Sequence, residues 1–121
     1  MQAIAVSEYG GSPVVTELPK PKPGPGQLLI KVHAASLNPM DRNIADGGWK
    51  ERMPGTFPMV LGADVAGVVE ALGDGAKRFS PGDEVFGISR GSFAEYAACR
   101  SESLPFISRW PSSELGTRTP L

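Results

Sequence analysis

Residues 27–35, QLLIKVHAA, carry the clearest secondary-structure signal in the chain. One set of alternating positions is apolar: Leu28, Ile30, Val32 and Ala34. The other set is polar except at its second member: Gln27, Leu29, Lys31 and His33. A period of two residues is typical of a strand with one buried face. The stretch therefore predicts a β-strand over residues 27–35.

Further short strands are predicted on both sides of this segment, separated by clusters of glycine and proline. The candidate strands are residues 2–6, 14–18, 65–72, 84–86 and 92–98. Residues 65–72 are nearly all apolar, which predicts a strand buried on both faces. Gly67 within it would allow close backbone approach. Residues 19–26 contain four prolines, and we expect an exposed connector there because proline lacks the N–H that a sheet needs.

The composition agrees with a single mainly-β domain. The chain has 121 residues, of which 40% are hydrophobic, and 15 glycines and 12 prolines suit a turn-rich β protein. Only residues 39–46 predict a short helix, with Asn38 as N-cap and Pro39 as its first residue. No alternation of strands with helices is present, so an antiparallel barrel or sandwich fits best.

Charge, hydropathy and cysteine content exclude several classes of protein. The net charge of −1 lacks the basic excess of a nucleic-acid-binding protein. No apolar run approaches the ~18 residues of a membrane span. The N-terminus does not resemble a signal peptide, so we expect a cytoplasmic protein. Cys99 is the single cysteine, which excludes an intramolecular disulfide and a Cys-rich zinc module.

Residues 101–121 differ from the rest because they show neither alternation nor a helical stripe. We expect the domain to cover residues 1–100 and the remainder to be an irregular tail. The stretch 114–117, ELGT, is what adjacent cloning sites can encode. The tail is therefore either vector-derived or frame-shifted, or a native terminus. Both interpretations stay open, and no function is assigned to it.

Five pieces of sequence occur in a characteristic order: VHAASLNPMD (32–41), PMVLGADVAGVV (58–69), Gly73, FSPGDEVFG (79–87) and GSFAEY (91–96). Together they resemble the N-terminal, GroES-like domain of medium-chain dehydrogenases/reductases, in the zinc-free quinone oxidoreductase branch. The resemblance covers residues 1 to about 100. It implies a mainly-β, partly open GroES-like barrel with one or two short helices, in agreement with the strand pattern.

The resemblance also implies NAD(P)H as cofactor of a complete two-domain enzyme. Members of the family continue into a Rossmann domain, which holds the cofactor pyrophosphate on a Gly-rich turn before a helix. No G-x-G-x-x-G motif occurs in this chain. We therefore expect the Rossmann domain to be absent and the chain alone to bind no cofactor tightly and to be inactive.

Zinc is not expected. Zinc-dependent relatives carry a Cys at the position of Asn38 and a His-Glu pair at the position of Ala63 and Asp64. A catalytic zinc needs about three protein ligands, and here only Asp64 of these residues could be one. Some other group must then polarise a substrate carbonyl, and a fixed hydrogen-bond donor can do so.

The resemblance places Asn38 at the substrate end of the cleft, where its neutral amide could donate to the substrate oxygen. The alternative is that Asn38 only caps the helix. Asp41 matches the family's Asn-Pro-x-Asp pattern and is the second candidate catalytic residue, because it could orient Asn38 or a water. Its alternative is a local backbone contact or an ion pair with Arg42.

Four further residues are assigned to the substrate and cofactor cleft: Asn43, Trp49, Ala63 and Asp64. Asn43 stands where several quinone oxidoreductases have a tyrosine, which puts a tyrosine proton donor in doubt. Trp49 could line the substrate pocket or close the end of the barrel. No metal-ligating residue is assigned.

The expected function is the substrate side of an NAD(P)H-dependent, zinc-independent oxidoreductase acting on quinones or α,β-unsaturated carbonyls. The partners are then a small carbonyl or quinone substrate and the missing Rossmann domain, without nucleic acid or membrane, and a homodimer is left open. The alternative is a stand-alone GroES-like binding or assembly module without catalysis. A truncated product without activity of its own is compatible with the first interpretation.

Overall fold

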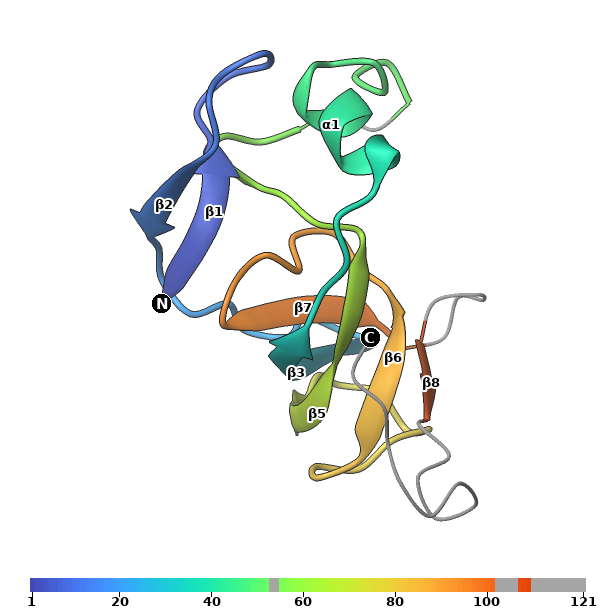
Figure 1. The fold of residues 1–121 in the computed structure, drawn as a ribbon. Coiled ribbons are helices and arrows are strands. Elements are labelled where there is room, and N and C mark those ends of the chain that lie inside the picture. Colours follow the sequence, from blue (N-terminus) through green and yellow to red (C-terminus); the bar gives the residue numbers. More distant parts are fainter. Residues whose placement is uncertain (53–54, 102–106, 110–121) are drawn as a thin grey trace.

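The computed structural model describes residues 1–52, 55–101 and 107–109. Within them, two antiparallel sheets and one short helix form the fold (Figure 1). The three-stranded sheet has the order β2-β1-β4 and comprises β1 (Gln2–Val6), β2 (Val14–Glu17) and β4 (Met59–Val60). The five-stranded sheet has the order β7-β3-β5-β6-β8. Its strands are β3 (Gln27–Ala34), β5 (Asp64–Leu72), β6 (Glu84–Ile88), β7 (Tyr96–Arg100) and β8 (Ile107–Arg109).

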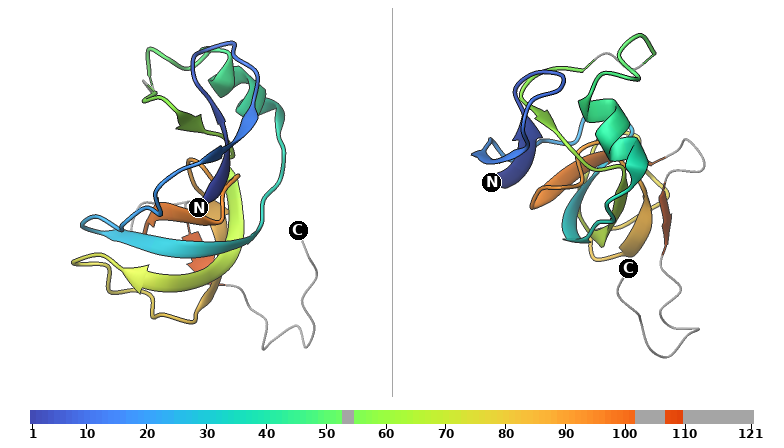
Figure 2. Two further views of the ribbon diagram at one scale, coloured as in Figure 1. Left: turned by 90° about the vertical axis from the view of Figure 1, so that its left-hand side faces the viewer. Right: turned by 45° about the horizontal axis from the view of Figure 1, so that its top comes forward.

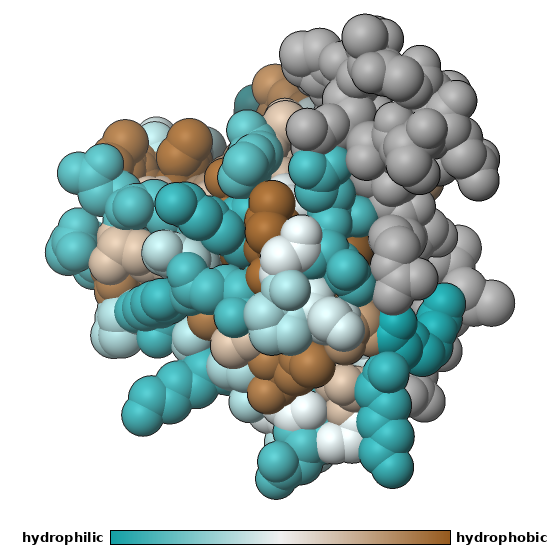
Figure 3. Space-filling model, turned by 90° about the horizontal axis from the view of Figure 1, so that it is seen from below, coloured by the Kyte–Doolittle hydropathy of each residue, from teal (hydrophilic) through white to brown (hydrophobic). Residues whose placement is uncertain are grey.

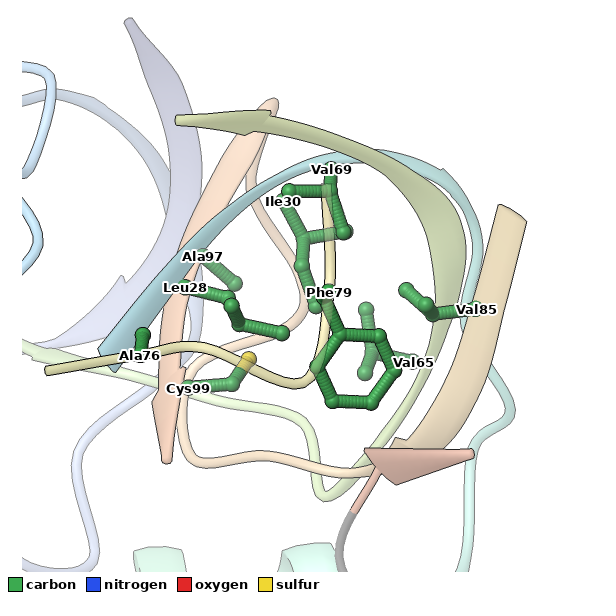
Figure 4. Packing of buried hydrophobic residues seen from close by; sticks show 9 residues of the cluster. All are labelled: Leu28, Ile30, Val65, Val69, Ala76, Phe79, Val85, Ala97 and Cys99. Atoms are coloured by element: carbon green, nitrogen blue, oxygen red, sulfur yellow. The ribbon is translucent and has the colours of Figure 1, made fainter. Parts of the chain in front are cut away.

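The strand predicted from alternation is confirmed as β3, which lies between β5 and β7. Figure 2 shows β3 and β5 running side by side as long curved strands. Their curvature wraps around the main core, where the Phe79 ring lies in the middle of the group (Figure 4). The core contains Leu28, Ile30, Val65, Val69, Ala76, Phe79, Val85, Ala97 and Cys99. Burial of one face of each strand is what the period of two residues predicts.

A smaller core lies between the three-stranded sheet and the helix, and it comprises Val6, Ala45, Met59 and Leu61. The two sheets are joined where residue 93 meets β1. The Ile4 N–H donates to the Phe93 carbonyl at 2.8 Å, and the Phe93 N–H donates to the Leu61 carbonyl at 2.9 Å. Because neither sheet closes on itself, the result is the partly open, mainly-β architecture that the sequence predicted.

Two strand predictions need correction. The strand predicted to be buried on both faces is present as β5, but its burial alternates and Glu70 is exposed. The reason is that β5 belongs to a curved antiparallel sheet, which packs only its concave face against the core. The last predicted strand begins at Tyr96 rather than Ser92, because residues 92–95 pair instead with β1 and the turn before β5.

The helix α1 (Pro39–Ala45) begins where the sequence predicts and ends one residue earlier, with Asp46 as its C-cap. Asn38 is the N-cap residue with extended backbone, and Pro39 is the first helical residue. Beyond the C-cap, Gly47 adopts a φ of +92°, a conformation that glycine accepts without a Cβ penalty. The helix lies above the five-stranded sheet, at the same end of the molecule as the loop between β1 and β2 (Figures 1 and 2).

Within the segment 101–121, expected to be irregular, residues 107–109 form β8 and pair antiparallel with β6. Ser101 is buried, and its hydroxyl donates to the Gly26 carbonyl at 2.9 Å. The cloning-site stretch lies outside the described residues.

Hydrophilic residues cover much of the face seen in Figure 3, with smaller apolar areas between them. No helix in the described part of the chain has the length and apolarity to cross a membrane.

The proline-rich connector is fastened to the sheet by Lys20. Its ammonium lies 2.5 Å from Glu70 Oε2 and 4.2 Å from the centroid of the Tyr96 ring. The hydrogen bond to Glu70 raises the pKa of Lys20, and the same bond lowers the pKa of the Glu70 carboxyl. Lys20 therefore fastens the connector to the five-stranded sheet through Glu70 and Tyr96.

We expect Lys20→Met to lower the Tm at pH 7 by about 1–3 °C, since exposed ion pairs stabilise weakly. Because the pKa of Lys20 is raised, its ion pair with Glu70 contributes stability at pH values below the ordinary pKa of 10.5. This contribution is lost as the pH rises through the raised pKa. Because the pKa of Glu70 is lowered, the same ion pair contributes stability at pH values above the ordinary pKa of 4.5. This contribution is lost as the pH falls through the lowered pKa. Thermal scans should therefore show the largest difference between pH 4.5 and 10.5 and a smaller one in 1 M salt.

Lys22→Met is the matched control, because Lys22 lies in the same connector, is exposed and has no ion pair among the described residues. An equal loss of Tm in both variants would show that the contact with Glu70 does not stabilise the fold.

Candidate functional site

A hydrogen bond joins two of the residues assigned to the site. The Asn38 amide nitrogen Nδ2 donates to Asp64 Oδ2 at 2.6 Å. Both side chains are half-buried, so this charge-assisted bond is partly sheltered from water. The bond fixes the orientation of the Asn38 amide and leaves the second N–H of Nδ2 free of any partner among the described residues.

The topology of the sheet explains why these two residues meet although 26 positions separate them. Strands β3 and β5 are antiparallel and pair Ala34 with Ala66. The end of β3 and the beginning of β5 therefore lie at the same edge. Asn38 follows Ala34 by four residues, and Asp64 is the first residue of β5, so the chain that leaves β3 for α1 passes beside Asp64.

Asp41 lies in the first turn of α1 and holds the backbone of Asn38. Its Oδ2 accepts the Asn38 backbone N–H at 2.8 Å, which is one half of a capping box. The guanidinium of Arg42 pairs with Asp46 at 2.9 Å rather than with Asp41. Asp41 thus fixes the backbone of Asn38 at the start of α1.

The Asp41 side chain is also unusual in its burial. The residue is 3% exposed, and its Oδ1 has no hydrogen-bond partner within the described residues. An unpaired buried carboxylate oxygen is costly in free energy. Its position one turn from Asn38 makes it the second polar group of the site.

The remaining three assigned residues do not hydrogen-bond to this group within the described part of the chain. Asn43 is exposed on α1, and its carbonyl accepts the Gly48 N–H at 2.9 Å. Trp49 is half-buried beyond the far end of the helix. The Ala63 carbonyl accepts the Ser89 N–H at 2.6 Å. The site therefore centres on Asn38, Asp41 and Asp64.

Nowhere in residues 1–52, 55–101 and 107–109 do three His, Cys, Asp or Glu side chains gather as a metal ion would need. Cys99 lies in the main core on β7, where burial raises the pKa of its thiol above the ordinary value of 9.0. Thiolate is the form of cysteine that binds metal, and this environment opposes it. The donor set near Asn38 consists of one amide and two carboxylates.

This arrangement can bind and orient a small polar group. A neutral amide donor that a carboxylate holds in place suits an oxygen on which negative charge develops, because it needs no reorganisation during the reaction. The amide stays neutral at any pH, so its donor capacity does not depend on pH. Sequence reasoning named all three residues but could not show the bond between Asn38 and Asp64.

Comparison with known proteins identifies a family and several relatives of this chain. Residues 24–108 match the family described as the alcohol dehydrogenase GroES-like domain. Human quinone oxidoreductase is 44% identical over 102 residues, which cover 80% of this chain and 30% of that protein. A trans-enoyl reductase of Fusarium mangiferae is 42% identical over 98 residues, covering 80% of this chain and 25% of that protein.

A mycobacterial protein solved in complex with NADPH is similar in structure, with a TM-score of 0.80 and 32% identity. The match covers 93% of this chain and 34% of that protein. The chain thus spans about a third or less of the length of these relatives.

The family match and these relatives place the chain in the medium-chain dehydrogenase/reductase superfamily. The chain belongs to the alcohol dehydrogenase GroES-like domain family, in the quinone oxidoreductase-like branch. This confirms the family predicted from the five sequence pieces.

Proposed function

We propose that this domain forms the substrate side of a nicotinamide-dependent oxidoreductase that reduces quinones or α,β-unsaturated carbonyls without zinc. The observation that carries the proposal is the Asn38 amide, held by Asp64 with one N–H free. The names of the human and fungal relatives support these two substrate classes. The presence of NADPH in the mycobacterial relative supports the cofactor.

Each residue of the site has a distinct task in this proposal. Asn38 donates its free amide N–H to the substrate oxygen and stabilises the charge that develops there. Asp64 holds the amide, and Asp41 holds the Asn38 backbone. When bound, the nicotinamide ring supplies the hydride. Trp49, Asn43 and Ala63 are assigned to other parts of the same cleft, with Trp49 on its substrate side.

The described residues do not fit the phosphate groups of such a cofactor. A pyrophosphate site usually needs free N–H groups at a helix N-terminus. In α1 the first residue is Pro39, which has no N–H, and the acidic Asp41 occupies the first turn. The turn at Gly73 and Gly75 follows β5 and does not lead into a helix.

We therefore expect the 121-residue chain alone to bind NADPH only weakly and to show no turnover. Titration calorimetry with the purified chain should show no saturation at micromolar cofactor, with the NADPH-binding mycobacterial relative as positive control. A Kd of about 1 µM or tighter would correspond to roughly 8 kcal/mol of binding free energy. Such a result would contradict the expected lack of a phosphate site.

The function itself can be tested in a chimera. Residues 1–101 of this chain would replace the matching segment of human quinone oxidoreductase, to which the chain is 44% identical. We expect NADPH-dependent quinone reduction that persists after treatment with a metal chelator. A folded chimera that binds NADPH but reduces neither a quinone nor an enone would overturn the proposal.

The alternative of a binding or assembly module predicts a different result for the chain alone. A ring-shaped oligomer in solution would favour it, whereas a monomer or homodimer would not. The gene sequence beyond the codon for Ser103 gives a further test, since a frame that continues into a Gly-rich βαβ unit supports the oxidoreductase. A cytoplasmic location is part of the same proposal.

A further inference from the structure

Tyr9 connects the loop between β1 and β2 with the segment that follows α1. The phenolic oxygen of Tyr9 accepts the backbone N–H of Gly55 at 2.9 Å. The Tyr9 ring meets the Phe57 ring edge-on, with 5.0 Å between centroids and an interplanar angle of 89°. Aromatic pairs prefer this geometry. A residue near the N-terminus thus contacts a segment 46 positions away.

Glycines at both ends of the contacted segment allow this approach. A Cβ at Gly47 would lie 3.2 Å from Tyr9 Cγ, and a Cβ at Gly55 would lie 3.2 Å from the Tyr9 hydroxyl. Any larger side chain at Gly47 or Gly55 would therefore press on Tyr9. The segment thus approaches Tyr9 closely at both glycines, and at Gly55 it also approaches Met59 Sδ, which a Cβ would meet at 2.9 Å.

The smaller core also holds the Tyr9 side chain in place. Tyr9 is half-buried and packs against the smaller core, which comprises Val6, Ala45, Met59 and Leu61. The neighbouring Gly10 N–H donates to the Ala45 carbonyl at the end of α1 at 2.9 Å. Figure 2 shows the β1–β2 loop beside α1. Because Tyr9 is anchored to the core, its hydroxyl presents a fixed acceptor to Gly55.

We propose that Tyr9 is a positioning residue for residues 47–52 and 55–57, and through them for Trp49. Trp49 lies within this segment and is only half-buried, so its placement depends on the backbone that carries it. The consequence for substrates rests on the function proposed above, in which Trp49 lines the cleft. Tyr9 then influences which substrates fit, whereas Asn38 acts on the reacting oxygen.

The first test uses the chain itself. Tyr9→Phe removes only the hydroxyl that accepts the Gly55 N–H and keeps the ring. We expect the Gly55 amide to exchange with solvent about fivefold faster or more, and the Trp49 indole signal to shift in ¹⁵N spectra. Trp110→Phe assigns the two indole signals. Tyr9→Leu, which also removes the aromatic pair, should give larger shifts.

Tyr96→Phe is the matched control, because Tyr96 lies on β7 and undergoes the same chemical change away from this segment. It should leave both signals where they are. Unchanged Gly55 exchange and an unchanged Trp49 signal in Tyr9→Phe would overturn the proposal, whatever the outcome for the chimera.

The second test uses the active chimera. Tyr9→Phe should change the KM for a bulky quinone by about threefold or more while kcat stays within about twofold, because Asn38 is untouched. A KM equal to that of the parent chimera would overturn the link to substrate fit. An inactive chimera would count against the proposed function, while the exchange measurement would still decide the role of Tyr9.

Discussion

Replacing Asn38 by alanine in the chimera should lower kcat for quinone reduction by about 100-fold or more. Removal of one preorganised donor from a developing oxyanion typically has an effect of this size. The Asn38 amide meets the structural requirement, since Asp64 holds it through one N–H and leaves the other free. Steady-state kinetics at saturating NADPH would measure the change, with circular dichroism to confirm folding.

The control for this variant is Arg42→Ala on the same helix. Arg42 is 83% exposed and, among the residues that the structure describes, pairs with Asp46 alone, so its loss should alter kcat by no more than about twofold. If Asn38→Ala behaved like Arg42→Ala, Asn38 would be a helix N-cap and nothing more.

Two variants distinguish the hydrogen-bond acceptor of Asp64 from its negative charge. Asp64→Asn keeps an oxygen that can accept the Asn38 N–H, whereas Asp64→Ala removes the acceptor. We expect kcat to stay within about tenfold in the first variant and to fall further in the second. Equal activity of both variants would show that orientation of the amide by residue 64 does not matter.

The parts of this fold that were predicted correctly depend on local sequence. Alternation over residues 27–35 gave β3 to within one residue, because a period of two reports directly on a half-buried strand. Asn38 followed by Pro39 gave the start of α1, because the capping preferences act within one turn.

The parts that could not be predicted depend on which strands pair. The bond between Asn38 and Asp64 follows from the antiparallel register of β3 and β5, which no local pattern encodes. The contact between Tyr9 and Gly55 was missed for the same reason. The burial of β5 was misjudged because Ala66 and Val68 are apolar yet lie on its less buried face.

Gly67→Ala should lower the free energy of unfolding by about 3 kcal/mol, the upper range for overpacking. A Cβ at Gly67 would lie 2.1 Å from the Lys31 carbonyl oxygen and 2.9 Å from Ile30 Cγ2. The first of these atoms belongs to the backbone of β3 and cannot rotate away. The two strands would have to separate, and their hydrogen bonds would weaken. Urea denaturation of the purified chain would measure the loss.

Gly24→Ala is the matched control, because a Cβ there would meet only the Gln27 side chain, at 3.3 Å from Oε1. That side chain can move, so we expect a change within about 1 kcal/mol. Equal stability of the two variants would mean that the close approach of β3 and β5 at Gly67 does not stabilise the fold.

The effect of Gly67→Ala should also reach the site. Gly67 pairs with Val32 beside the register shift between Val32 and Ala34, and Asn38 follows that shift by four residues. Separation of β3 from β5 at this point would move Asn38 away from Asp64. We therefore expect the Asn38 side-chain amide signals in ¹⁵N spectra to change in Gly67→Ala and to stay in place in Gly24→Ala, because the same close packing that stabilises the sheet also aligns the amide with its carboxylate.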